Sequence, residues 1–188
     1  MNKRLLVALV LVEIVLGVIL STHVLDQLEF PEATFPIYDK FDTGLDGWSY
    51  WGDSGYVLKW ISNTANISGD GYGVDCGMQK VVDLANWDQS KELLLSFDWK
   101  ATSDYSSPSG TTGATLWIQY ADSGYSIYRE DIVKGGTADT GWRNYVKDIS
   151  SYVHARYRIR IILYLHDGWS PDWHQTNAYD NIKLSSAT

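Results

Sequence analysis

Residues 156 to 165 read Arg-Tyr-Arg-Ile-Arg-Ile-Ile-Leu-Tyr-Leu, and this stretch decides the fold. Its apolar residues alternate with basic ones: Tyr157, Ile159, Ile161, Leu163 and Leu165 on one face, Arg156, Arg158 and Arg160 on the other. A period of two is typical of a half-buried antiparallel β-strand. We expect the arginine face to be solvated and to pair with acidic residues on neighbouring strands. The alternative is that it binds acidic sugars or an acidic partner subunit.

Four further segments show strand patterns. They cover residues 92–101, 115–120, 125–133 and 143–149, and clusters of Gly, Ser, Asp and Asn separate them. No long helical pattern follows residue 24. Many short strands between turn-rich segments predict an all-β fold, specifically an antiparallel β-sandwich of the jelly-roll type.

The first 24 residues are expected to form a hydrophobic targeting helix. Lys3 and Arg4 precede an apolar run over residues 5–20, which is shorter than the roughly 20 residues of a comfortable membrane span. Glu13 interrupts the run and further disfavours a spanning helix. The segment is therefore a cleaved signal peptide or an uncleaved N-terminal membrane anchor. Either predicts a secreted or cell-surface protein that meets a membrane only through this segment.

The rest of the chain divides into two parts. Residues 25–38 contain Pro31 and Pro36 and no helical periodicity, which indicates an extended lead-in segment or a donor strand. Residues 39–188 form one β-sandwich domain without an internal repeat. A glycosylation sequon, Asn-Ile-Ser at 66–68, is compatible with export.

Composition excludes some functions. Nine Trp and thirteen Tyr accompany only four Phe, and because Tyr and Trp carry a polar group, some of these rings are expected to face solvent. The net charge of −8 argues against nucleic acid as a partner, since such binding depends on neutralising phosphates. Cys76 is the single cysteine, so no internal disulfide forms, and we expect it to be a small buried residue.

Five short segments resemble, in their order along the chain, the landmarks of jelly-roll carbohydrate-binding modules of the CenC-like group. They are Phe-Asp-Thr-Gly-Leu-Asp-Gly-Trp at 41–48, Met-Gln-Lys-Val-Val-Asp-Leu at 78–84, Leu-Leu-Ser-Phe-Asp-Trp-Lys-Ala at 94–101, Thr-Gly-Trp at 140–142 and Tyr-Asp-Asn-Ile-Lys-Leu at 179–184. The resemblance covers about residues 39 to 185. It implies a fold more strongly than a ligand, because such sandwiches carry many functions.

The resemblance also implies a structural calcium ion that joins the first and last strands. By position its side-chain ligands are Asp42 and Asp180, and Asp70 or Asp75 adds one from the middle of the chain. Calcium needs six to eight oxygen ligands, which suits carboxylates. The alternative is that Asp42 and Asp180 only cap turns.

Tryptophan positions indicate where a sugar binds. Trp48, Trp99 and Trp142 align with core positions of the resembled family, so we expect them to be structural. The remaining candidates for a ligand-binding platform are Trp51, Trp117, Trp169 and Trp173. Trp169 and Trp173 belong to a loop between the last two strands, and loops on a rigid scaffold commonly carry binding groups. Packing is the alternative role for each ring.

Catalysis has little support in the sequence. The five Glu residues are scattered, the His residues lack zinc-motif spacing, and neither a nucleophile elbow nor a phosphate loop is present. We therefore predict a non-catalytic extracellular module that binds a glycan or polysaccharide.

The alternative is a self-assembling surface filament or tube subunit, because the chain also resembles, more weakly, the single β-domain subunits of archaeal extracellular threads and tubes. Residues 28–38 would be its donor strand in a homo-polymer, with Leu28, Phe30, Phe35 and Ile37 as apolar contacts.

Overall fold

The computed structural model describes residues 32–52, 57–70, 75–103, 113–132, 139–154, 157–166 and 174–187. These residues form two six-stranded sheets and a single 3-10 turn, η1 (Ser150–Tyr152). The predicted antiparallel β-sandwich is confirmed. No helix in the described ranges is long and apolar enough to cross a membrane. The predicted targeting helix over residues 1–24 lies outside the described residues.

The first sheet, sheet A, has the order β1-β6-β11-β8-β9, and a sixth strand, β3, pairs with β6. Their bounds are β1 (Glu32–Thr34), β6 (Asp75–Asp83), β11 (Arg158–His166), β8 (Gly113–Tyr120), β9 (Ser126–Asp131) and β3 (Ser49–Gly52). The β1–β6 pair is parallel, and the other described pairs of this sheet are antiparallel.

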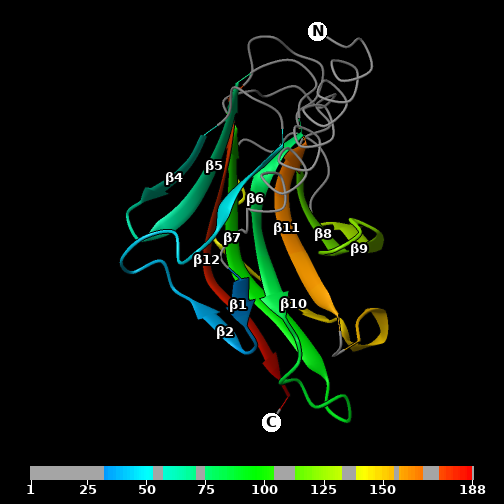
Figure 1. Cartoon of the computed structure of the whole chain (residues 1–188). Coiled ribbons are helices and arrows are strands. Elements are labelled where there is room, and N and C mark those ends of the chain that lie inside the picture. Colours follow the sequence, from blue (N-terminus) through cyan, green and yellow to red (C-terminus); the bar gives the residue numbers. More distant parts are fainter. Residues whose placement is uncertain are drawn as a thin grey trace, which may run out of the picture. The chain divides into compact units, whose positions relative to one another are not determined.

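The second sheet, sheet B, has the order β10-β7-β12-β5-β4, and β2 pairs with β12. Their bounds are β10 (Arg143–Asp148), β7 (Leu93–Ser103), β12 (His174–Ser186), β5 (Thr64–Asp70), β4 (Val57–Ile61) and β2 (Ile37–Asp39). Figure 1 shows β8, β9 and β11 on one side of the sandwich and β4, β5 and β12 on the other.

The predicted alternation in residues 156–165 decides which side of β11 faces the core. Ile159, Ile161, Leu163 and Leu165 are all fully buried between the sheets. On the opposite face Arg158 forms ion pairs with Glu32 (2.5 Å) and Asp122 (3.1 Å), as expected for a solvated arginine. Tyr157 is 47% exposed and does not join the core, and Arg156 lies outside the described residues.

A buried ion pair ties the two sheets together near their first strands. Lys80 of β6 contacts both carboxylate oxygens of Asp39 in β2, at 2.9 and 2.8 Å, and also the backbone oxygen of Asp46 at 2.6 Å. The indole of Trp48 donates to the same carboxylate at 2.9 Å. The chain therefore supplies its own cation for this buried acidic residue.

The segment predicted as a lead-in or donor strand, over residues 25–38, is described from residue 32. Its β1 and β2 strands pair with β6 and β12 of the same chain. Phe35 and Ile37 are buried in this chain's own core. The other two expected donor contacts, Leu28 and Phe30, lie outside the described residues. The described part of the segment thus completes the sheets of its own sandwich.

Three expectations for single side chains can be compared with the fold. Cys76 is free and fully buried, as predicted. Trp48 and Trp99 are each 3% exposed, so their structural role is confirmed. Trp142 is 52% exposed, so the prediction of a structural role for it was wrong. It precedes β10 and shares the period-two face of exposed Val146, whereas Tyr145 packs against the core.

Candidate functional site

Two of the four predicted platform tryptophans come together on the outer face of sheet A. Trp51 lies on β3 and Trp117 on β8, with β6 and β11 between them. At about 4.8 Å between neighbouring strands, their backbones are about 14 Å apart. Their ring centroids nevertheless lie 5.7 Å apart in an edge-to-face arrangement, so both side chains lean towards each other. Trp169 and Trp173 lie outside the described residues.

Tyr164 of β11 is the third ring of this group. Its centroid lies 5.5 Å from that of Trp51 and 6.2 Å from that of Trp117, and it is 1% exposed beneath them. Gly77 makes the contact possible, because it pairs with Trp51 on one side and Tyr164 on the other. A Cβ atom at Gly77 would lie 2.5 Å from the Cβ of Tyr164. The absent side chain leaves the space over which the two rings meet.

Arg129 of β9 completes what we call the aromatic cluster: Trp51, Trp117, Tyr164 and Arg129. Its guanidinium carbon lies 5.7 Å from the centroid of Trp117 and 5.4 Å from that of Tyr164. The Trp117 indole donates to the hydroxyl of Ser126 at 2.7 Å, which fixes the ring orientation. Burial raises the pKa of Tyr164 despite the opposing charge of Arg129, so its phenol stays neutral.

Three polar side chains lie next to the cluster on the same face and form what we call the polar row: Gln79, Arg160 and Gln119. Arg160 pairs in register with Gln119, and Gln79 is two residues from Val81, the other register partner of Arg160. The Gln79 amide donates to the backbone oxygen of Tyr50 at 3.2 Å. Its Oε1 and the Nε of Arg160 are buried without a hydrogen-bond partner among the described residues.

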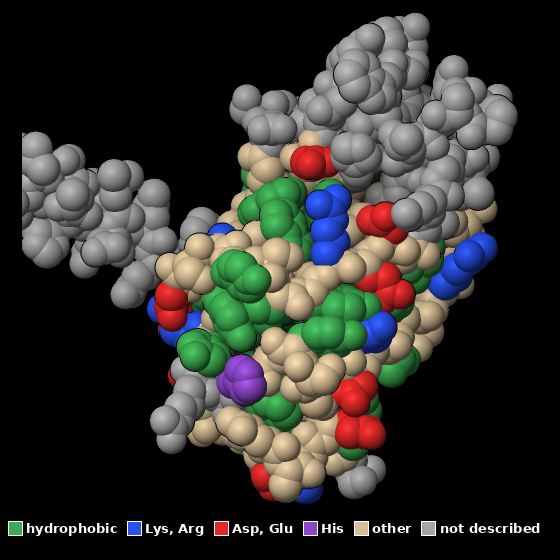
Figure 2. All heavy atoms as spheres, turned by 90° about the vertical axis from the view of Figure 1, so that its right-hand side faces the viewer, with side chains coloured by type: hydrophobic (Ala, Val, Ile, Leu, Met, Phe, Trp, Pro, Cys, Tyr) green, Lys and Arg blue, Asp and Glu red, His purple; other side chains and the backbone are tan. Residues whose placement is uncertain are grey.

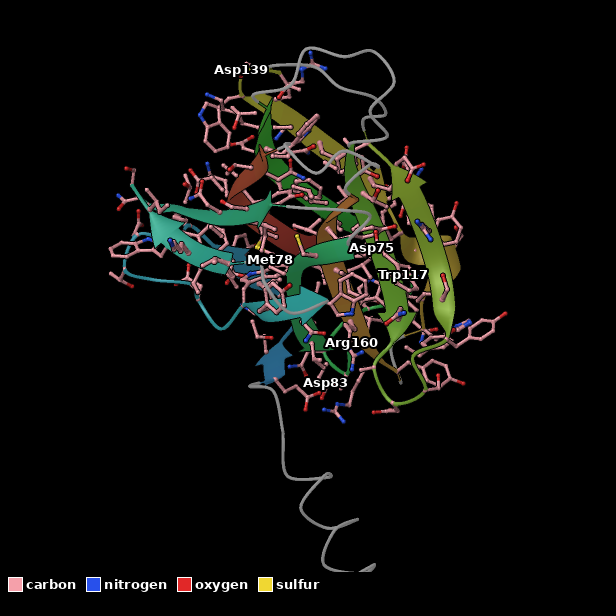
Figure 3. The ribbon with its side chains drawn as sticks, turned by 90° about the horizontal axis from the view of Figure 1, so that it is seen from above. Asp75, Met78, Asp83, Trp117, Asp139 and Arg160 are labelled. Carbon is pink, nitrogen blue, oxygen red and sulfur yellow. The ribbon has the colours of Figure 1, made fainter. Side chains whose placement is uncertain are left out.

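The figures place this face on one side of the sandwich. In Figure 3, Trp117, Arg160 and Asp75 are drawn on the sheet A side and Asp139 elsewhere, while the register separates Asp75, opposite His166, from Arg160, opposite Val81, along the strands. Figure 2 shows hydrophobic side chains in separate patches, interleaved with acidic and basic ones. One exposed patch of the fold brings Tyr120 within 4.7 Å of Tyr157 and 6.5 Å of Tyr125, measured between ring centroids. This confirms that several rings face solvent.

The predicted calcium ligands are only partly gathered. Asp42 is exposed and Asp180 is half-buried. Burial, and then the neighbouring charges of Asp98 and Asp42, raise the pKa of Asp180, so the carboxylate of Asp42 lies near those of Asp98 on β7 and Asp180 on β12. Asp75 faces the opposite outer side, where its charge acts on Tyr164. The side chain of Asp70 lies outside what the structure describes.

Nothing among the described residues forms a complete metal centre from side chains alone, since no three His, Cys, Asp or Glu side chains are grouped to hold an ion. Asp98 already accepts from Asn144 and Asn181, both at 2.9 Å. The backbone amide of Asn181 donates to Asp180 at 2.7 Å. A shared cation at Asp42 and Asp180 would therefore need backbone oxygens and water as further ligands.

The sequon at residues 66–68 lies on β5. Asn66 is 9% exposed, and its amide nitrogen donates to the backbone oxygen and the hydroxyl of Thr64, at 3.1 and 2.8 Å. An acceptor nitrogen held in this way is a poor target for glycan transfer, although the sequon itself is compatible with export.

No family model matches this sequence, and no curated protein matches it. Solved structures do match. A family 11 carbohydrate-binding module from Clostridium thermocellum, in complex with a β-1,3-1,4-mixed-linked tetrasaccharide, is 15% identical, with a TM-score of 0.51 over 81% of this chain and 96% of that one. The xylan-binding domain from carbohydrate-binding module family 22 is 11% identical, with a TM-score of 0.50 over 80% and 94%.

The C-terminal family 22 module of Clostridium thermocellum Xyn10B gives the same picture, with 11% identity and a TM-score of 0.50 over 80% of this chain and 93% of that one. Identities this low show the fold alone. These likenesses give no support to the interpretation as a filament subunit. The chain has the β-sandwich fold of carbohydrate-binding modules.

Proposed function

We propose that this chain is a non-catalytic module that binds a glycan or polysaccharide outside the cell, through the outer face of sheet A. The observation that carries the proposal is the aromatic cluster beside the polar row with its two unpaired buried atoms. Trp51, Trp117 and Tyr164 are far apart in the sequence, and none of the three belongs to the core between the sheets. The shared fold and the export pattern of residues 1–24 also support it.

Sugar rings present apolar C–H faces edged by hydroxyl groups. They need an aromatic surface and hydrogen-bonding groups side by side, as small-molecule sites generally do. Trp51 and Trp117 supply the first. Gln79, Gln119 and Arg160 supply the second, and the Oε1 of Gln79 and the Nε of Arg160 have no hydrogen-bond partner among the described residues.

The environment of Glu130 supports the proposal of binding rather than hydrolysis. Glu130 accepts from the hydroxyls of Tyr128 and Tyr145, and these bonds lower its pKa. A carboxyl held in its ionised form and already hydrogen-bonded is poorly suited to act as a general acid on a glycosidic bond. It serves instead to connect β9 of sheet A to β10 of sheet B.

A structural calcium ion at Asp42 and Asp180 is part of the proposal. Support comes from their crowding, because a cation between them would offset the repulsion that raises the pKa of Asp180. In that position the ion would join the chain before β3 to β12. Asp75 is not part of this site.

The test uses native gels that contain mixed-linkage β-glucan, xylan or β-1,4-galactan, in which binding retards migration. Trp51→Ala and Trp117→Ala should each weaken binding at least about tenfold, or about 1.4 kcal/mol, as expected for a central aromatic contact. Tyr125→Ala is the control, since Tyr125 is 69% exposed and lies outside the cluster. Its affinity should stay at the wild-type value.

Stability must be measured on the same variants, because both rings cover Tyr164. Unfolding temperatures near the wild-type value would show that lost binding is not lost folding. Wild-type affinity in both variants, or a wild-type protein that migrates identically with and without every polysaccharide, would contradict the proposal.

A further inference from the structure

We infer that the outer face of sheet B carries a second, separate glycan-binding groove, which takes a neutral polysaccharide segment. The groove has a volume of about 370 Å³, within the range of about 300–1,000 Å³ for small-molecule sites. It runs from Ile61 at the end of β4 to Trp142 at the start of β10. Crossing from the first of these strands to the last spans about 19 Å at about 4.8 Å per strand.

The hollow arises from the side chains that the register brings into one row. Ala178 of β12 lies between Asn66 of β5 and Lys100 of β7. Because the side chain of Ala178 is only a methyl group, the surface at the centre of the sheet is hollowed there. Ile61 and Trp142, both large and about half exposed, rise at its two ends.

Trp142 gives this groove its affinity for sugar. Its ring is 52% exposed and has no ring partner among the described residues. An exposed indole at the wall of a groove is free to stack on the apolar face of a sugar. A ligand that buries such a ring gains binding free energy, since large aromatic surfaces contribute much of the binding energy at interfaces.

The floor supplies hydrogen-bonding groups without net charge. Thr102 and Thr176 place hydroxyls there. The Thr102 hydroxyl donates to the backbone oxygen of Thr176 at 3.4 Å, the Thr176 hydroxyl shares a hydrogen bond with that of Ser68 at 3.1 Å, and both oxygens can accept a further bond. Asn66 uses its amide nitrogen on Thr64 of β5 and the backbone oxygen of Ile61 of β4, and its carbonyl oxygen accepts no hydrogen bond from a described residue. Lys100, the single charged lining residue, lies 3.4 Å from the carboxylate of Asp139. The balanced charge favours a neutral sugar over an acidic one.

The two sites face away from each other, because each lies on the outer side of its own sheet. One module could then hold two polysaccharide chains at once and cross-link them. Two linked contacts also raise avidity well beyond either alone. The groove extends the proposed glycan binding but depends on none of the residues of the aromatic cluster.

The experiment follows indole N–H signals by nuclear magnetic resonance, with the Trp51, Trp117 and Trp142 signals assigned by Trp→Phe variants. The probes are a mixed-linked β-glucan tetrasaccharide, xylohexaose and β-1,4-galactotriose. We expect the Trp142 signal to shift with at least one of them. Trp142→Ala should weaken binding at this face at least about tenfold, and Ala178→Gln, which fills the floor, should do the same. Tyr38→Ala, 58% exposed on β2, is the control.

The outcomes separate this inference from the proposed function. A shift of Trp142 that Ala178→Gln abolishes supports the groove, whether or not Trp51 and Trp117 respond. Shifts of Trp51 and Trp117 alone, with Trp142 unmoved at saturating sugar, overturn it and leave the proposed function standing. No shift of any of the three indoles with all three probes overturns both.

Discussion

Replacing Lys80 with methionine tests the tie between the two sheets. The side chains of Lys80 and Asp39 are 5% and 10% exposed, and the ammonium group contacts both carboxylate oxygens. Lys80→Met keeps much of the apolar length of the side chain but removes the charge. Asp39 would then remain buried, with the indole of Trp48 as its remaining hydrogen-bond donor among the described residues.

The expected cost follows from leaving one charge of a buried pair uncompensated. Such changes cost about 3–5 kcal/mol of unfolding free energy. For a domain of this size that is a fall of about 6–20 °C in the unfolding temperature, at about 2–4 °C per kcal/mol. Adding Asp39→Asn to Lys80→Met removes the stranded charge and keeps an acceptor for Trp48, so the double variant should recover at least about 1 kcal/mol.

Urea unfolding followed by tryptophan fluorescence measures these differences, provided the slope with urea stays constant. Lys100→Met is the matched control, because Lys100 forms an ion pair at 3.4 Å with an Asp139 side chain that is 55% exposed. That pair should contribute less than about 1 kcal/mol. A loss below about 1 kcal/mol in Lys80→Met, or a double variant less stable than the single one, would refute the reasoning.

Two further predictions concern acidic residues. Hydrogen bonds from Tyr128 and Tyr145 lower the pKa of Glu130, so its ionised form stabilises the fold above its unfolded-state pKa, and this contribution is lost as pH falls through the folded value. Glu130→Gln should therefore lower the unfolding temperature at pH 7 and change it little at pH 3. An equal fall in unfolding temperature at both pH values would contradict this prediction. Asp180 has a raised pKa, so without a bound cation its ionisation costs stability as pH rises above its unfolded value. Calcium should offset that cost, so it should raise the unfolding temperature of the wild type at pH 7 but not that of Asp180→Ala. Identical unfolding temperatures of the wild type with calcium and with chelator would refute the proposed calcium site.

The strands could be predicted because their signal is local. In residues 158–165 the period of two places four apolar residues inward, and the structure buries all four. Trp51 and Trp117 could be chosen as platform candidates because they are tryptophans outside the positions that match the resembled family's core, and the structure brings their rings together. Tyr164 was missed, yet it shares the parity of Arg158 and Arg160, and this parity places it on the outer face.

The remainder of the aromatic cluster depends on register, which a single strand does not encode. Gly77 opposes both Trp51 and Tyr164 only because three strands align in one particular way. A slip of one residue would turn every side chain to the other face. Arg129 could not be placed over Trp117 without knowing that β9 pairs with β8.

Trp142 shows a different limit. Its place in the order of landmarks is compatible with the resembled family, but order says nothing about the face on which a residue lies. The spacing to Val146 and the opposite parity of Tyr145 predict an outward side chain, and this signal was available in the sequence. The resemblance to the family predicted a buried Trp142, whereas the period of two predicted an exposed one. The exposed ring agrees with the period of two.

The two outer faces differ in how far they are ordered before any ligand arrives. On sheet A, outward-facing Ile162, Tyr164 and Gln79 are 0%, 1% and 5% exposed, so neighbouring contacts already restrain these side chains. On sheet B, Trp142 is 52% exposed and has no ring partner in the described ranges, so fewer contacts restrain it and a ligand stacked on it would immobilise it. Immobilising a side chain costs about 0.5–1.5 kcal/mol. For equal stacking, the sheet A site should therefore bind the same sugar roughly two- to tenfold more tightly, and the groove would act mainly when both faces engage a polymer.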